Sequence, residues 1–238
     1  MYKISFYKFF SLDMLKKNAK IFLAGHLGLV GSSILKKLKL ENYKQIFVVK
    51  KNKLNLLDQK KTFAYLKKIK PDLVINCAAR VGGINAHQMN KSNFIYENIQ
   101  IQNNLIHGSF LAGVKNFINL TSSCIYPEKS KIPIKENALL SGYLEKTNDA
   151  YSIAKISGLK MCQAYSENYK LNYKTLMACN LYGEGGNYDL KKSQFYHALI
   201  KKIHLAKVNN RNTLEIWGSG LPKRELMHVD DAASAVIF

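Results

Sequence analysis

The chain has 238 residues, a formal net charge of +20 at pH 7 and 47% hydrophobic residues, so it can bury a sizeable core. Its four cysteines (Cys77, Cys124, Cys162 and Cys179) lack metal-ligand spacing, and no apolar run reaches the length of a membrane span, so we predict a cytoplasmic protein without a metal site or a membrane partner. The lysines are spread over the whole chain and form no basic stripe, which argues against a nucleic-acid partner.

The first folded stretch combines a strand, a glycine-rich turn and a helix. The apolar run Lys20–Ala24 predicts a buried strand, and leucines at helical spacing predict a helix over Ser32–Leu40. Between them lies Gly25-His-Leu-Gly-Leu-Val-Gly31, whose glycines permit a tight turn and a close approach of the backbone to a pyrophosphate. The amide groups at the start of the helix favour phosphate at the same place. This arrangement is typical of a dinucleotide-binding site.

The residues after the second predicted strand bear on the form of the dinucleotide. That strand is Gln45–Val49, and Lys50-Lys-Asn-Lys53 follows it. An enzyme that prefers NAD usually carries an acidic residue here for the ribose 2′-hydroxyl, whereas cations suit the 2′-phosphate of NADP. We therefore predict NADP, with ordinary lysines of a solvated loop as the alternative.

Further strands and helices alternate along the chain. Apolar runs predict strands over Asp72–Ala78, Lys115–Thr121 and Tyr173–Cys179, and the helical period predicts helices over Lys60–Lys68 and Asn90–Ala112. Strands that alternate with helices at this spacing predict an α/β fold with a doubly wound parallel sheet of the Rossmann type.

The last part of the chain has a different organisation. We predict a basic amphipathic helix over Lys191–Val208, a short strand over Thr213–Trp217 and a capped helix that starts at Val229. Because the sequence stops at Phe238, soon after that helix begins, we expect a small, incomplete C-terminal substrate domain. The predicted division is an N-terminal extension (1–18), an NADP-binding domain (19–183) and a partial substrate-binding region (184–238) that returns to the NADP-binding domain near 224–238.

Two short motifs predict the catalytic chemistry. Ser122-Ser-Cys124 follows a buried strand, where ligands of open α/β sheets bind, and Tyr151 and Lys155 lie four residues apart on a predicted helix. A lysine beside a phenol favours the phenolate and lowers the phenol's pKa, which suits a tyrosine for proton transfer. A hydroxyl such as that of Ser122 could hold the oxygen that gains or loses the proton. A chance pair on a solvated helix face is the alternative for Tyr151 and Lys155 taken alone.

Seven motifs in one order identify a family. They are Gly25-His-Leu-Gly-Leu-Val-Gly31, Val81-Gly-Gly-Ile84, Ser122-Ser-Cys-Ile-Tyr-Pro127, Tyr151-x-x-x-Lys155, Asn180-Leu-Tyr-Gly183, Trp217-Gly-Ser-Gly220 and Arg224-Glu-x-x-His-Val-Asp-Asp231. Together they resemble the GDP-L-fucose synthase family of extended short-chain dehydrogenases/reductases, over about residue 20 to the last residue. The resemblance implies a dual epimerase and NADPH-dependent reductase that acts on a GDP-4-keto-6-deoxy sugar.

The resemblance also implies roles for individual residues. Ser122, Tyr151 and Lys155 would be the reductase triad, and Cys124 would be an epimerase base. The long helices that contain Asn90–Ala112 and Tyr151–Tyr169 would pair two chains into a homodimer. The implied cofactor-binding residues are Gly25, Leu27, Gly28, Leu29, Val30, Gly31, Lys51, Leu56, Lys155, Asn180 and Gln194, and the implied substrate-binding residues are Lys202, Trp217 and Arg224.

Three positions depart from the family pattern. The family's second epimerase residue, a histidine, falls on Gln194, which cannot act as an acid or base, and His197 three residues later could substitute for it. Two arginines of the family fall on Leu27 and Lys51, which could weaken the preference for NADP. Besides the dual enzyme, the sequence therefore leaves open a 4-reductase without epimerase activity and an NADP-binding remnant with little activity.

Overall fold

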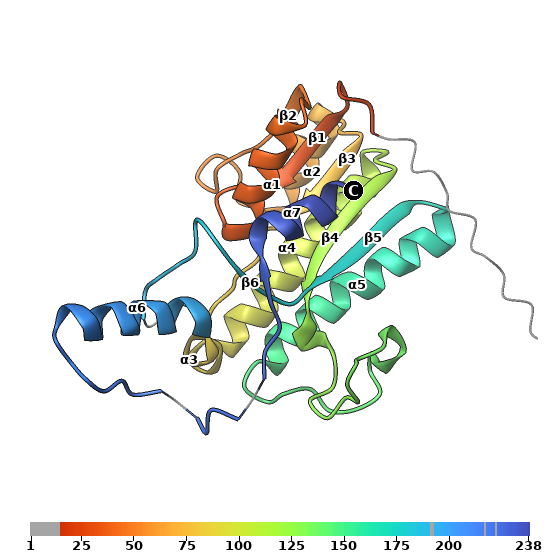
Figure 1. Cartoon of the computed structure of the whole chain (residues 1–238). Helices are drawn as coiled ribbons and strands as arrows, with labels where there is room; N and C mark the ends of the chain where they lie inside the picture. Colours follow the sequence, from red (N-terminus) through yellow and green to blue (C-terminus); the bar gives the residue numbers. More distant parts are fainter. Residues whose placement is uncertain (1–14, 191–192, 217, 222) are drawn as a thin grey trace, which may run out of the picture.

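A five-stranded parallel sheet forms the centre of the molecule. The computed structural model describes residues 15–190, 193–216, 218–221 and 223–238. The strands lie in the order β2-β1-β3-β4-β5 (Figure 1), and each neighbouring pair is parallel. This confirms the predicted Rossmann-type sheet. The strands are β1 (Lys20–Ala24), β2 (Gln45–Phe47), β3 (Leu73–Asn76), β4 (Asn116–Ser122) and β5 (Asn172–Ala178).

Helices cover both faces of this sheet because the strands are apolar on both sides. In β1, Ile21 and Leu23 belong to one buried cluster, whereas Phe22 and Ala24 belong to another, as the two-residue period of a strand requires. The helices are α1 (Leu29–Leu40), α2 (Gln59–Ile69), α3 (Ile84–Met89), α4 (Lys91–Leu111), α5 (Asp149–Tyr169), α6 (Phe195–Val208) and α7 (Val229–Ile237).

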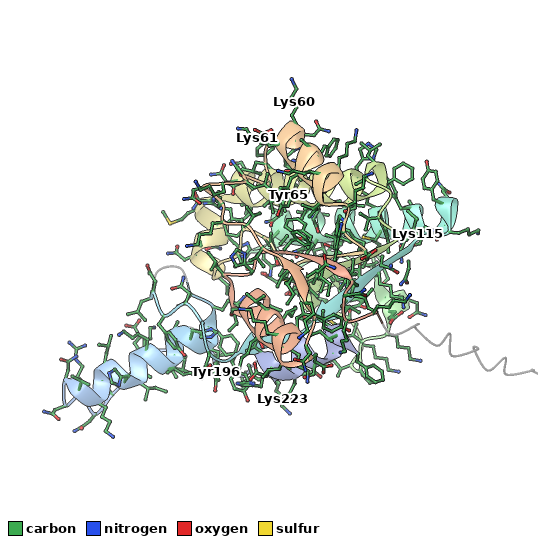
Figure 2. The ribbon with its side chains drawn as sticks, turned by 90° about the horizontal axis from the view of Figure 1, so that it is seen from above. Lys60, Lys61, Tyr65, Lys115, Tyr196 and Lys223 are labelled. Carbon is green, nitrogen blue, oxygen red and sulfur yellow. The ribbon has the colours of Figure 1, made fainter. Side chains whose placement is uncertain are left out.

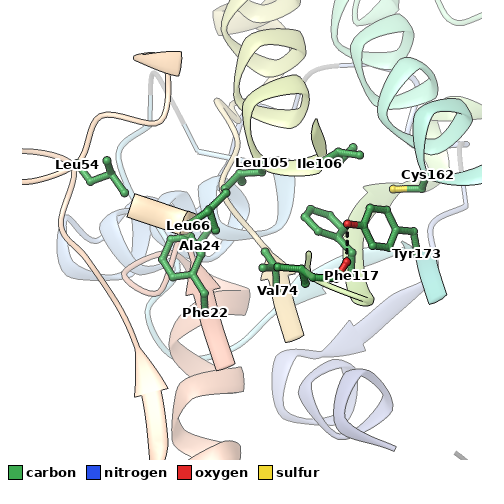
Figure 3. Close-up of a cluster of buried hydrophobic side chains, with 11 residues drawn as sticks. Phe22, Ala24, Leu54, Leu66, Val74, Leu105, Ile106, Phe117, Cys162 and Tyr173 are labelled. Carbon is green, nitrogen blue, oxygen red and sulfur yellow. Dashed lines mark hydrogen bonds between the residues drawn. The ribbon is translucent and has the colours of Figure 1, made fainter. Parts of the chain in front are cut away.

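The two clusters define which helices share a face. The cluster of Phe22 contains residues of α2, α4 and α5 (Figure 3), and the cluster of Ile21 contains residues of α1 and α7. Tyr173 closes the first cluster at the β5 end of the sheet, where its hydroxyl donates a hydrogen bond to Val114 O at 2.9 Å. The sheet therefore lies between two helical layers, and its strand ends are left for a site.

Lysines point outward on different sides of this body. Lys60 and Lys61 extend from α2 at the top of the view in Figure 2, and Lys115 lies at its right-hand side. All three are exposed. The lysine side chains are thus spread over the surface, as their even distribution along the sequence predicts.

The segment after β5 extends beyond the sheet and then returns. The short strands β6 (Asn180–Tyr182) and β7 (Leu226–His228) form a separate parallel pair. Between them, α6 projects away from the sheet (Figure 1), while α7 packs against α1. The hydroxyl of Ser33 on α1 fixes this return by donating to the carboxylate of Asp230 at 2.5 Å.

Two predicted elements differ from the structure, and one helix, α3, was not predicted. Residues 213–216 form no strand: they are mostly exposed, and within the described ranges no neighbouring strand supplies the backbone partners that a strand needs. Trp217, the last residue of that prediction, lies outside the described residues. The helix predicted from Lys191 begins at Phe195, because Gln194 has extended backbone angles; residues 191–192 of that prediction lie outside the described residues. The helix predicted from Asn90 is preceded by the separate six-residue helix α3.

A buried chain of amides links β3, β4, α4 and α5 behind the strand ends. Asn76 donates to Asn119 Oδ1 at 2.9 Å, and Asn119 donates to Gln102 Oε1 at 3.4 Å. Gln102 in turn donates to Ala154 O at 2.7 Å, one residue before Lys155. Asn76, Asn119 and Gln102 are each at most 1% exposed, so every broken link leaves a buried polar group without a partner. This chain fixes the position of α5 against the sheet.

Gly158 provides the space that this chain needs. A Cβ at position 158 would overlap Gln102 Oε1 and lie 2.5 Å from Gln102 Cδ. We expect Gly158→Ala to lower the free energy of unfolding by about 1–3 kcal/mol, because Gln102 must leave its hydrogen bonds. Urea unfolding measures this, with Lys160→Ala on the exposed side of the same helix as the control. Equal stability of the two variants would contradict the account.

Candidate active site

The predicted catalytic residues meet at the carboxyl end of β4. Ser122 ends that strand, and Cys124 lies in the short 3₁₀ helix that follows it (Ser123–Ile125). Tyr151 and Lys155 lie in the first two turns of α5, so their four-residue spacing places them on one helical face, as predicted. Lys155 is 4% exposed, and its ammonium donates to Leu120 O at 2.9 Å. The structure thus brings the four residues together from three elements.

The pKa of Tyr151 differs in direction from the sequence-based expectation. Burial raises the pKa of the Tyr151 phenol above its ordinary value, and the charge of a Cys124 thiolate acts in the same direction. The Lys155 ammonium lies 5.7 Å from the centre of the Tyr151 ring and is bonded to Leu120 O. The expected lowering of the Tyr151 pKa is therefore wrong for this arrangement, because desolvation of the phenolate by burial is the largest effect on it. The phenol is a protonated donor at neutral pH.

Cys124 is also held in its protonated form. Burial raises the pKa of the Cys124 thiol, while hydrogen bonds from Ser152 and Ser122 and the charge of Lys155 act in the opposite direction. Ser152 is fully buried beside Tyr151 and was not singled out by the sequence analysis. Its only sequence signal is its place within the tyrosine–lysine motif. The thiol, two hydroxyls, the phenol and the ammonium form one compact group.

Burial of Lys155 has a measurable cost. Burial lowers the pKa of Lys155 from its ordinary value of 10.5 to about 8. The folded state therefore disfavours the charge that the unfolded chain carries, so the cost is full below pH 8 and disappears as the pH approaches 10.5.

We expect Lys155→Met to be more stable than the parent by about 1–3 kcal/mol at pH 7, because it removes this cost while keeping an apolar stem. The gain should shrink as the pH rises from 8 towards 10.5. Urea unfolding of both proteins across this range measures it. A gain that is absent at pH 7, or independent of pH, would contradict the assignment.

The glycine loop after β1 forms a cradle that fits a dinucleotide pyrophosphate. Gly25 has φ +84°, and a Cβ there would lie 2.6 Å from Ala78 N at the end of β3. Gly28 is the N-cap of α1 without a side-chain hydrogen bond, so backbone amides of the first turn face the loop. Backbone donors at a helix N-terminus suit phosphate oxygens. The loop is thus shaped by backbone alone, with no side chain filling it at the glycines.

Cations lie beside this cradle. Burial lowers the pKa of His26, the second residue of the loop, and the Lys50 ammonium lowers it further. This places Lys50 within electrostatic reach of the loop, whereas Lys51 is exposed on the turn that follows β2. Asn104 donates to Leu56 O at 2.7 Å and so ties the same region to α4. The local charge suits a phosphate, which fits the predicted NADP.

The other implied binding residues are dispersed. Asn180 donates to Glu225 O at 3.1 Å between β6 and β7, and Gln194 is the N-cap of α6. Lys202 donates to Glu215 O at 3.2 Å two turns further along α6. The Arg224 guanidinium is exposed and contacts the carbonyl of its neighbour Lys223. Trp217 lies outside the described residues. The structure therefore forms the triad and the glycine loop as compact groups. The implied substrate residues remain separate from one another on the segment after β5.

One further residue borders the site. The ring of His87 on α3 forms a T-shaped pair with the Tyr151 ring, with ring centroids 5.2 Å apart. The sequence analysis noted the Val81-Gly-Gly-Ile84 motif just before it and overlooked the histidine. The signal available was an ionisable residue one turn after the glycine pair. The position against Tyr151 depends on the tertiary structure.

The described residues offer neither a metal site nor a membrane-spanning helix. Within the part of the chain that the structure describes, no group of three or more histidine, cysteine, aspartate or glutamate residues could hold a metal ion. None of the helices in those same ranges is long and apolar enough to cross a membrane.

Comparisons with known proteins all point to one family. Residues 21–238 match the model of the NAD-dependent epimerase/dehydratase family. The chain is 45% identical over 225 residues to a putative GDP-L-fucose synthase 2 of Arabidopsis thaliana, covering 94% of this chain and 69% of the relative. It is 44% identical over 219 residues to a GDP-L-fucose synthase of Sinorhizobium fredii, covering 92% and 69%. A solved structure of a GDP-mannoheptose C4 reductase from Campylobacter jejuni, with NADP bound, has a TM-score of 0.84 at 33% identity and covers 93% and 74%.

Proposed function

The chain belongs to the NAD-dependent epimerase/dehydratase family and is GDP-L-fucose synthase-like within it, and we propose that it reduces the 4-keto group of a GDP-4-keto-6-deoxy sugar with NADPH. The observation that carries the proposal is the convergence of Ser122, Tyr151 and Lys155 at the end of β4. The product would be GDP-L-fucose or a related GDP-deoxy sugar.

The cofactor fits the first part of the site. The glycine loop would hold the pyrophosphate through its backbone amides, and Lys50 and Lys51 would lie on the side of the 2′-phosphate. NADPH, when bound, supplies the hydride. The similar Campylobacter jejuni reductase was solved with NADP, which supports this form of the cofactor.

The residues of the chain then supply the proton. The Ser122 hydroxyl would donate a hydrogen bond to the sugar's carbonyl oxygen and hold it near Tyr151. As the carbonyl carbon receives the hydride, the Tyr151 phenol would donate its proton to that oxygen, which leaves an alcohol. The raised pKa of Tyr151 keeps the donor protonated beforehand. The buried Lys155 would stabilise the phenolate that results.

A 4-reductase without epimerase activity is the second candidate, and two observations favour it. Gln194 is an amide at the N-cap of α6 and cannot donate or accept a proton as an acid or base would. Burial raises the pKa of Cys124, so little thiolate is present as a base at neutral pH. The dual activity requires another acid or base in place of Gln194, and His197 is the candidate named from the sequence.

One incubation tests these proposals. The protein is mixed with NADPH and GDP-4-keto-6-deoxy-mannose, the absorbance of NADPH is followed, and the sugar formed is identified by NMR. Oxidation of NADPH with GDP-L-fucose as product supports the dual enzyme. Oxidation that yields only the unepimerised deoxy sugar supports the 4-reductase. If NADPH binds but is not oxidised, the reductase proposal is overturned and the chain acts as an NADP-binding remnant.

We also propose a homodimer that pairs through α4 and α5. Tyr96 on α4 and Ile153 and Tyr169 on α5 are exposed apolar side chains, which supports a partner on these helices. Gel filtration with light scattering tests it. A monomer at the concentrations used for the assay would overturn the proposal.

A further inference from the structure

A buried histidine outside the predicted triad packs directly on its tyrosine. His87 is 7% exposed and lies between two rings. The His87 and Phe94 rings are tilted by 32° with centroids 4.0 Å apart, and the His87 and Tyr151 rings form a T-shaped pair with centroids 5.2 Å apart and an interplanar angle of 74°. Phe94 itself meets Tyr151 edge-on at 6.4 Å. The three rings together limit the positions that the Tyr151 ring can adopt.

One hydrogen bond fixes the orientation of the His87 ring. Its Nε2 lies 3.1 Å from Gly82 O, so Nε2 carries the proton and donates to that carbonyl. Burial lowers the pKa of His87, against opposing effects of this bond and of the Glu145 carboxylate, so the ring is neutral at pH 7. Its Nδ1 is then a lone-pair acceptor, and it is buried without a partner among the described residues.

The unpartnered Nδ1 shows that packing alone does not account for this residue. A phenylalanine would fill the same space without a buried polar atom, whereas histidine adds a cost at Nδ1 and an anchor at Nε2. The anchor ends on the Gly82–Gly83 turn after β3. That turn is itself confined, because a Cβ at Gly83 would lie 2.5 Å from Ser193 O. The histidine therefore connects a fixed turn of the backbone to the ring of Tyr151.

We propose that His87 is a positioning residue that aims the Tyr151 phenol at the carbonyl oxygen of the sugar. The proposal rests on the proposed reductase function, in which Tyr151 donates the proton. His87 acts through the tyrosine: its Nδ1 is closed to solvent, and its ring contacts Tyr151, Phe94 and Gly82. Loss of the hydrogen bond to Gly82 O lets the His87 ring move, and the Tyr151 ring that packs on it moves too. A small displacement of a proton donor slows proton transfer steeply.

The kinetic test compares three variants of the full chain. His87→Phe keeps a ring but loses the anchor, and we expect it to lower kcat by about 10- to 100-fold while the KM for the keto sugar and the Kd for NADPH stay within about twofold. His87→Gln keeps a donor for Gly82 O and should recover part of the rate. His107→Phe is the matched control, because His107 also contacts a tyrosine, with Nδ1 2.6 Å from the Tyr165 hydroxyl. It should keep the parent rate.

A double variant shows whether the effect passes through Tyr151. In a Tyr151→Phe background, His87→Phe should not lower the residual rate further, since the donor that it positions is already absent. A full additional loss in that background would overturn the proposal. So would an unchanged kcat in His87→Phe, or an equal loss in His107→Phe.

A second readout does not depend on turnover. With ¹³C-labelled tyrosine, the Tyr151 signal is assigned from its absence in Tyr151→Phe. We expect it to shift or broaden in His87→Phe and to stay unchanged in His107→Phe. If the parent protein does not oxidise NADPH, the reductase function fails, and the NMR comparison alone decides whether His87 positions Tyr151. An unchanged Tyr151 signal in His87→Phe would overturn the proposal in either case.

Discussion

Replacing Tyr151 with phenylalanine should lower the rate of keto-sugar reduction by about 10²- to 10⁴-fold, which is the usual contribution of one general acid. The variant loses the hydroxyl proton and keeps the ring that packs on His87 and Phe94, so we expect the fold to be unchanged. The glycine loop is untouched, so NADPH should bind as before. Single-turnover oxidation of NADPH measures the rate, and quenching of protein fluorescence measures binding.

Tyr169→Phe is the matched control for this prediction. Tyr169 is the last residue of the same helix, 18 residues from Tyr151, or about 27 Å along the axis. It should keep the parent rate. If Tyr151→Phe instead retained most of the activity, a different group would donate the proton, and the mechanism proposed for Tyr151 would be wrong. A parallel loss of NADPH binding would show that the tyrosine holds the cofactor and would not isolate a proton donor.

Local sequence patterns predict much of the fold and the centre of the site. The residues from Ile21 to Ala24 are apolar on both faces of the strand, so helices must cover both sides of the sheet. The four-residue spacing of Tyr151 and Lys155 fixes a shared helical face once the helix forms. These features depend on neighbours within one or two turns, so sequence reasoning reaches them.

Other features depend on residues that are distant in the sequence. The pKa of Tyr151 is raised by burial, and burial arises from the packing of α3, α4 and α5 together. His87 reaches Tyr151 across 64 positions of sequence, a contact that no local pattern indicates. The strand expected over 213–217 has a suitable pattern, yet among the described residues no strand pairs with residues 213–216. The residue types of this segment favour a strand, but a strand also needs a neighbouring strand as a hydrogen-bond partner, and only the tertiary structure decides whether one is present.

The glycine loop leads to the second large prediction, because Gly31 has no room for a side chain. A Cβ at this position would overlap Gly25 O and lie 2.7 Å from Gly25 C and 2.9 Å from His26 Cα. All three obstacles are backbone atoms, and Gly25 is itself confined by Ala78 N. The loop and the start of α1 must therefore separate. We expect Gly31→Ala to lower the free energy of unfolding by about 3 kcal/mol.

Cofactor binding should fall with it, since separation of α1 from the loop moves the amides that would hold the pyrophosphate. We expect the Kd for NADPH to rise by at least about tenfold under conditions in which Gly31→Ala is still folded. Gly28→Ala is the control for stability: its Cβ would meet only Gly25 O at 3.5 Å, and φ −80° with ψ 168° suits alanine. Urea unfolding should show Gly28→Ala within about 0.5 kcal/mol of the parent. If Gly31→Ala were equally stable and bound NADPH equally well, the loop would not be the rigid cradle that the structure describes, and the cofactor would have to be held elsewhere along the strand ends.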